Sequence, residues 1–300
     1  MSNMSELLDK YHIITSVPLV KGWSRDQKYI LVDEDGRKYL LRISTQEYYE
    51  RKKAQFDLLR KIASLEIYST QAIEFGVFKD GSVYMLLSYL EGIDGEEAID
   101  TLNDQEAYAL GIEAGKILHQ LHSIEVPKQE HTWWERYQTK MYRKIEALQK
   151  CQYTIPNQEK IIQYYQEHWK LMQNRPVVFT HGDYHLGNMI VHNGNIGIID
   201  FDKANIADPY DDFKPFCWNV RKNAYFETGL IDGYFAHKIP NDFWKILKFY
   251  TAESLISQLP WSVSFGEEEI QTALEVAKQQ MLWYGDFELE IPTWYKGSDM

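Results

Sequence analysis

The spacing of apolar residues changes once along this chain, near residue 90, and that change limits the folds open to it. Up to that point, short runs rich in β-branched and aromatic residues predict strands. The predicted strands are 29–32, 38–43, 72–77 and 82–87, with a helix over 48–62. Because Asp and Gly clusters separate the strands of each pair, we expect two hairpins in one antiparallel sheet.

From Glu96 onward, apolar residues recur every three or four positions, which is typical of amphipathic helices. The predicted helices are 104–122, 134–149, 155–172, 242–259 and 267–284. A strand at 177–179 and a hairpin of 189–191 and 196–199 interrupt them. We therefore predict an α+β chain with a small lobe, residues 1–90, and a larger, mainly helical lobe, residues 91–300. A ligand site is expected where two such lobes meet.

Composition excludes several classes of protein. The two cysteines, Cys151 and Cys217, are far apart and favour neither a disulfide framework nor a zinc site. The N-terminus has no basic patch followed by an apolar run, and no stretch reaches the about 20 apolar residues of a membrane span. We expect a cytoplasmic protein that does not enter a membrane.

The charge of −12 is unevenly distributed. Residues 93–300 contain 19 Lys and Arg against 31 Asp and Glu, whereas residues 1–92 are balanced. Such an acidic surface repels nucleic acid and, where it lines a cleft, favours a cationic ligand. Solubility alone is an equally good explanation of the excess acid.

The densest set of reactive side chains lies between Phe179 and Asp202. An apolar strand ends there in a loop rich in His, Asp and Asn, and a hairpin then leads to further carboxylates. Asp183 and Asn188 are five residues apart, and Asp200 follows twelve residues later. Oxygen ligands of this kind suit Mg²⁺, which is usually held by one or two carboxylates together with substrate phosphates.

This segment, His181-Gly-Asp-Tyr-His-Leu-Gly-Asn188 followed by Ile199-Asp-Phe-Asp202 and Asp208-Pro209, resembles the catalytic and metal-binding loops of the aminoglycoside phosphotransferase family. The similarity extends over about residues 15–215. The family includes macrolide and choline kinases and has a bilobal, protein-kinase-like fold. The resemblance implies a small-molecule kinase that uses ATP or GTP with Mg²⁺ and phosphorylates a hydroxyl group.

The resemblance also implies roles for individual residues. Asp183 would orient the acceptor hydroxyl and accept its proton, while Asn188 and Asp200 would bind Mg²⁺. The nucleotide would be held by Arg42 at its α- and β-phosphates, by backbone amides near Ser24, and by hinge backbone groups at Ser88 and Leu90. His181, His185 and Asp208 would brace the catalytic loop.

Two positions depart from the family pattern. Arg42 stands where Lys is usual, and Gln55 stands on the next helix where a paired Glu is usual. Arginine keeps the charge but is not interchangeable with lysine. The ion pair must therefore be rebuilt or absent, and Glu47 and Glu50 are candidate partners.

Other interpretations stay open at this point. A His-x-Asp-x-His triplet also occurs in metal-dependent phosphoesterases, although no second cluster of metal ligands is evident here. His119 and His122, three residues apart, are more typical of core histidines than of metal ligands, and Trp133-Trp134 could line an acceptor pocket or belong to the core.

We expect a phosphotransferase acting on a small, cationic molecule, an aminoglycoside-like antibiotic or a related metabolite, with antibiotic resistance as one role. A macrolide or choline stays open as the acceptor. The alternative is a non-catalytic, kinase-shaped binding protein.

Overall fold

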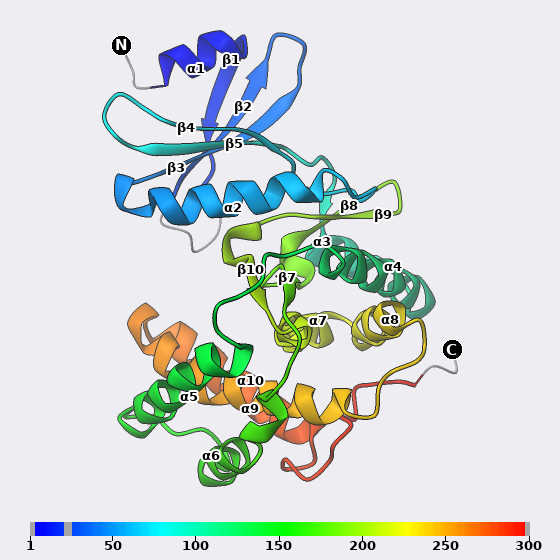
Figure 1. Cartoon of the computed structure of the whole chain (residues 1–300). Coiled ribbons are helices and arrows are strands. Elements are labelled where there is room, and N and C mark those ends of the chain that lie inside the picture. Colours follow the sequence, from blue (N-terminus) through cyan, green and yellow to red (C-terminus); the bar gives the residue numbers. More distant parts are fainter. Residues whose placement is uncertain (1–3, 21–25, 298–300) are drawn as a thin grey trace. The chain divides into compact units, whose positions relative to one another are not determined.

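The computed structural model describes residues 4–20 and 26–297, which form two compact units (Figure 1). The first unit contains the residues up to 94 together with 188–203. The second contains 95–187 and the residues from 204 onward. The lobes 1–90 and 91–300 remain a prediction about domains, but the hairpin segment 188–203 associates with the first unit. In the described part of the chain, no helix is long and apolar enough to cross a membrane.

A five-stranded antiparallel sheet forms the centre of the first unit, in the order β1-β2-β3-β5-β4. The strands are β1 (Ile13–Pro18), β2 (Gln27–Asp33), β3 (Lys38–Ser44), β4 (Ala72–Val77) and β5 (Val83–Ser88). Both predicted hairpins, β2–β3 and β4–β5, are confirmed. Strand β1 was not predicted because most of its side chains are exposed, so its sequence lacks the apolar alternation of a half-buried strand.

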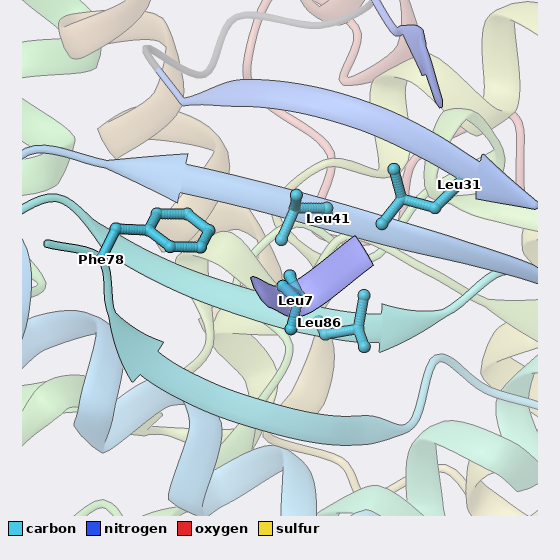
Figure 2. Close-up of a cluster of buried hydrophobic side chains, with 5 residues drawn as sticks. All are labelled: Leu7, Leu31, Leu41, Phe78 and Leu86. Carbon is cyan, nitrogen blue, oxygen red and sulfur yellow. The ribbon is translucent and has the colours of Figure 1, made fainter. Parts of the chain in front are cut away.

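The two faces of this sheet have different partners. On one face, leucines from β2, β3 and β5 pack with Phe78 and with Leu7 of helix α1 (Ser5–Lys10), as Figure 2 shows. Because neighbouring side chains of a strand point to opposite faces, Arg42 projects away from the cluster that contains Leu41. Helix α2 (Tyr49–Ile62), which was predicted, packs on β4 and β5.

A smaller three-stranded sheet completes the first unit, in the order β6-β8-β9. Its strands are β6 (Ile93–Asp94), β8 (Met189–His192) and β9 (Asn195–Ile198), followed by the short helix η4 (Phe201–Lys203). The predicted hairpin β8–β9 turns at Asn193 and Gly194, which have φ of 50° and 78°. Asn and Gly tolerate positive φ, so the sequence of this turn fixes its geometry.

Helices dominate the second unit. They are α3 (Gly95–Ile99), α4 (Asp104–His122), α5 (Trp133–Gln149), α6 (Gln158–Glu167), α7 (Phe216–Lys222), α8 (Ala224–Phe235), α9 (Phe243–Ser262) and α10 (Glu267–Trp283), with 3₁₀ segments η2 (Trp169–Met172), η5 (Pro209–Phe213) and η6 (Val263–Phe265). The predicted helix over 155–172 is shorter: α6 ends at Glu167, and only one 3₁₀ turn follows. Two short antiparallel strands, β7 (Val178–Thr180) and β10 (Asn205–Ala207), lead into and out of the segment that contains the candidate site.

Helices α4 and α8 touch through glycines on both sides. Gly111 and Gly115 of α4 face Gly229 and Gly233 of α8, and a Cβ at any of the four would meet backbone atoms of the other helix closer than 3.0 Å. The spacing of four residues puts each pair on one helix face. The backbones can therefore approach only because no side chain intervenes.

Replacing Gly111 with Ala should lower the free energy of unfolding by about 1–3 kcal/mol, because the added methyl forces the helices apart. In an ordinary helix position the same change would stabilise by about 1 kcal/mol, so the sign is diagnostic. Urea denaturation measures the difference, with the exposed α4 change Gln120→Ala as the control. A Gly111→Ala protein as stable as the wild type would contradict the close contact.

Candidate functional site

Arg42 lies at the centre of a buried charge cluster in the first unit. Its side chain is 4% exposed and contacts three carboxylates: Asp26 at 2.9 Å, Asp200 at 3.0 Å, and Asp202. Strand β3 carries Arg42 in the middle of the sheet, and the segment after β9 brings Asp200 and Asp202. All three guanidinium nitrogens therefore donate to carboxylates.

Helix α2 supplies the rest of the cluster. Lys52 Nζ lies 2.6 Å from Asp26 Oδ2 and 3.1 Å from Asp202 Oδ1. Gln55 Nε2 donates to Phe201 O and to Asp202 Oδ1. The candidate partners Glu47 and Glu50 are exposed instead. The ion pair is thus rebuilt: the helix contributes a lysine in place of an acid, and Asp26, just before β2, contributes the carboxylate.

These contacts favour the ionised forms of Asp202 and Asp26. Burial opposes ionisation of Asp202, but Arg42 and Lys52 outweigh it and lower its pKa to about 2. The pKa of Asp26 is also lowered, because Lys52 and Arg42 outweigh its burial. Lys28, cross-strand from Arg42 on β2, has its pKa lowered by burial and by Arg42. Three cations and three carboxylates therefore share the site.

The two predicted metal ligands lie at the open end of one hairpin. Met189 pairs with Ile198, and Ile199 N donates to Asn188 O at 3.0 Å, so Asn188 and Asp200 flank the same end of β8–β9. Asp200 has φ of 59°, a conformation that is uncommon for a non-glycine residue and tends to occur at functional sites. An amide oxygen and a partly exposed carboxylate fit Mg²⁺, with substrate oxygens and water as the further ligands.

The predicted nucleobase positions differ in availability. Ser88 is engaged, since its N–H donates to Gln71 O and its hydroxyl accepts from Gln71 N. Leu90, just after β5, has a backbone N–H and C=O that make no hydrogen bond with the described residues. Leu90 is therefore the better candidate for pairing with a base edge. Ser24 lies outside the described residues.

In the second unit, Asp212 organises the predicted catalytic loop. Its buried carboxylate accepts from the backbone N–H of His181 at 2.8 Å and of Gly182 at 2.5 Å. His122 Nε2 lies 3.0 Å from the same group, and His122 Nδ1 lies 2.8 Å from Tyr234 Oη. His122 is therefore a structural residue, as its helical spacing indicated.

The two loop histidines hold backbone groups around Asp183. His181 Nδ1 accepts from Asp183 N at 3.2 Å, and His185 Nδ1 accepts from Gly187 N at 3.1 Å. Since Nδ1 of His185 is an acceptor, its proton is assigned to Nε2, which lies 3.7 Å from Asp183 Oδ2. Both histidines shape the loop.

Asp208 contacts Arg175, Tyr250 and the start of η5 instead of this loop. It forms a two-point ion pair with Arg175 at 2.6 and 2.9 Å, accepts from Tyr250 Oη, and caps η5 at Tyr210 N. Asp208 was expected to brace the loop, but the carboxylate that accepts from the loop backbone is that of Asp212. The run Asp208-Pro-Tyr-Asp-Asp212 offered no signal to separate the two acids.

A second chain of contacts supports the loop from α7 and α8. Leu186 N donates to Asn219 Oδ1 at 2.8 Å, and Asn219 Nδ2 donates to Glu227 Oε2 at 2.7 Å. Glu227 is buried with no cation among the causes acting on its pKa, so burial raises that pKa to about 8 despite the bond from Asn219. Glu227 therefore folds as a neutral acid at pH 7.

This raised pKa predicts a stability that falls with rising pH. The unfolded chain loses the Glu227 proton near pH 4.5 and the folded chain near pH 8, so between these values the free energy of unfolding should fall by up to about 1.4 kcal/mol per pH unit. Glu227→Gln should flatten this dependence, whereas the exposed control Glu113→Gln should keep it. Urea denaturation from pH 5 to 8 measures both, and equal slopes in all three proteins would contradict the assignment.

Comparison with known proteins adds to this geometry. The family model described as "Phosphotransferase enzyme family", abbreviated APH, matches residues 15–241. A search of curated proteins gave no match.

Solved structures share the fold at low identity. The complex of APH(2")-IIIa with GDP and kanamycin is 16% identical, with a TM-score of 0.71 over 92% of this chain and 96% of that one. A thermostable mutant of aminoglycoside phosphotransferase APH(4)-Ia, apo form, is 17% identical, with a TM-score of 0.68 over 91% of this chain and 96% of that one. The amicoumacin kinase hAmiN in complex with AMP-PNP, Ca²⁺ and Ami is 18% identical, with a TM-score of 0.65 over 97% of this chain and 96% of that one. The fold is thus the α+β, kinase-like fold of these enzymes, and the chain belongs to the aminoglycoside phosphotransferase (APH) family of phosphotransferases.

Proposed function

We propose that this phosphotransferase moves the γ-phosphoryl group of ATP or GTP to a hydroxyl of a small molecule, with Mg²⁺ as its cofactor. The observation that carries the proposal is the arrangement at the open end of the β8–β9 hairpin. Asn188 and Asp200 lie at this end on the extensions of its two strands, and Arg42 forms an ion pair with Asp200. Phosphoryl transfer needs positioning and charge neutralisation more than covalent chemistry, and this cluster offers both.

Asp183 is the proposed base. It precedes the hairpin by a few residues, and its loop is fixed through Asp212, His181 and His185. A rigid loop of this kind holds a carboxylate so that it can orient an acceptor hydroxyl and accept its proton. Asn188 and Asp200 would hold Mg²⁺, which neutralises charge on the phosphate oxygens.

Nucleotide binding is proposed at Arg42 for the phosphates and at the backbone of Leu90 for the base. Ser88 would support this hinge segment through its bonds to Gln71. Since every nitrogen of Arg42 donates to a carboxylate, phosphate would have to share this guanidinium with the three acids. Lys28 lies cross-strand from Arg42, on the same sheet face. It is therefore a second candidate cation for phosphate.

For the acceptor, we propose a small cationic molecule of the aminoglycoside type, with antibiotic resistance as the corresponding role in the cytoplasm. The excess of Asp and Glu over Lys and Arg in residues 93–300 supports a cationic acceptor. Two of the structural neighbours were solved with kanamycin and with amicoumacin. A panel of aminoglycosides, amicoumacin, macrolides and amino alcohols, assayed with Mg²⁺ and ATP or GTP, tests the acceptor class. Absence of turnover with every member would contradict it.

Asp183→Asn should lower kcat by about 10²- to 10⁴-fold with little change in nucleotide affinity, because it removes the base but keeps the shape of the side chain. Steady-state assays with the best acceptor of the panel, together with AMP-PNP titrations, measure the two effects. The exposed change Asp57→Asn serves as the control. Retention of most turnover would remove Asp183 from this role.

Arg42→Met should cost about 3–5 kcal/mol of stability and weaken Mg²⁺-nucleotide binding, because it leaves buried carboxylates without their shared partner. Arg42→Lys should recover only part of the stability and part of the Mg²⁺-nucleotide affinity, since lysine cannot reach three carboxylates in the arginine geometry. Urea denaturation and AMP-PNP titration are the measurements, with the exposed Arg37→Met as the control. Wild-type behaviour of Arg42→Met would contradict the cluster.

A non-catalytic binding protein is the second candidate, and the commitment of Arg42 to three carboxylates favours it. Nucleotide that binds only the folded state must raise the melting temperature. A clear rise with Mg²⁺ and AMP-PNP, but no turnover and no effect of Asp183→Asn on any property, would support this second function. Turnover with any member of the panel would exclude it.

A further inference from the structure

One edge of Arg136, in the first turn of α5, is left unbound. Its Nη1 donates to Ile206 O at 2.9 Å. Its Nε and Nη2 are buried, and neither has a hydrogen-bond partner in the described part of the chain. Burial alone lowers the pKa of this arginine, with no carboxylate acting to raise it. A cation without an acidic partner is unexpected in a unit with such an excess of acid.

The unbound edge is the one that binds oxyanions. The N–H groups on Nε and Nη2 are parallel and match the two oxygens of a carboxylate or phosphate. Arg175, in the same unit, uses these two nitrogens to hold Asp208 at 2.6 and 2.9 Å. Arg136 presents the same pair of donors without the acid.

Trp133 adds a third donor beside it. Trp133 is 5% exposed, and its indole Nε1 is buried without a partner among the described residues. The Cζ of Arg136 lies 5.3 Å from the centre of the Trp133 ring. These three orphaned nitrogens carry four N–H groups, which a ligand with several acceptor oxygens would satisfy. Leaving buried donors unpaired is costly, so a ligand that pairs them gains that energy.

The position of Arg136 connects this set to the candidate catalytic loop. Ile206, which accepts from Arg136, lies in β10 and pairs with Phe179 of β7. Strand β7 ends at Thr180 and leads directly into His181 and Asp183. Arg136 is thus bonded to β10, which pairs with β7, the strand that precedes the proposed base.

We propose that Arg136 and Trp133 Nε1 form a binding site for an oxyanion of the carboxylate or phosphate type. The anion is either an acidic group that the acceptor carries in addition to its cationic groups or a free anion from solution. Only the first of these sources rests on the proposed function. Because the orphaned nitrogens are buried, the side chains that cover them must move to admit it. Entry of the anion then replaces unpaired donors with charge-assisted hydrogen bonds.

Titration with inorganic phosphate tests the site without any turnover. With Mg²⁺ and AMP-PNP present to occupy the nucleotide site and ionic strength held constant with chloride, phosphate should raise the melting temperature of the wild type by about 5 °C near 100 times Kd. Arg136→Gln should abolish the rise. Arg143→Gln, an exposed position on the same helix, should retain it.

Two further variants keep the test decisive if Arg136→Gln folds poorly. Arg136→Lys keeps the charge but loses the paired donors, and Trp133→Phe removes only the indole N–H with little change of shape. Each should weaken phosphate binding at least about threefold. An unchanged phosphate response in Arg136→Gln or Arg136→Lys, or no response in the wild type, would overturn the proposal.

Acceptor pairs that differ only in a carboxylate or its amide distinguish the two sources. If the anion belongs to the acceptor, Arg136→Gln should raise KM for the acid at least about tenfold with a small effect on kcat, and leave the amide unchanged. If phosphate binding is lost but the acid is unaffected, the free anion occupies the site. Failure of every acceptor would count against the proposed function, while the phosphate titration would still decide the role of Arg136.

Discussion

The contact of Arg42 with Asp26, Asp200 and Asp202 is the interaction on which the proposed nucleotide and metal residues of the first unit depend. It joins β3 to a segment 158 residues later in the chain. Three carboxylates so close together would repel one another, and burial would favour their protonation. Arg42 and Lys52 reverse that balance for Asp202 and lower its pKa to about 2. Arg42 also pairs with Asp200, which has a left-handed conformation at the end of the hairpin.

A corresponding constraint in the second unit acts through the close contact of α4 and α8. Helix α4 supplies His122 and the carbonyl of Ala114, which accepts from Tyr184 Oη. Helix α8 supplies Glu227, which holds Asn219 and through it the backbone of Leu186. Since both helices reach the loop around Asp183, the glycines between them set the distance at which these braces act. The packing of two helices therefore determines the shape of the loop that contains the proposed base.

Much of this could be predicted from the sequence because the signals were local. Alternating apolar residues and Asp-Gly or Asn-Gly turns identified β2–β3, β4–β5 and β8–β9, and helical spacing identified α2, α4, α5, α9 and α10. Helix α8 carries apolar residues all round, and β1 is mostly exposed, so neither has a clear period. Asp183, Asn188 and Asp200 were found from a motif, whereas Asp26 and Lys52 have no local signal that distinguishes them from surface charges.

The sequence by itself thus determined the family, the strand and helix types, and the identity of the candidate base and metal ligands, since each is encoded within a few neighbouring residues. Tertiary structure alone decided which charges meet. Asp212 braces the loop where Asp208 was expected, because η5 turns one acid toward His181 N and the other toward Arg175. The orphaned edge of Arg136 is likewise invisible in the sequence, because the lack of a partner depends on every element packed around it.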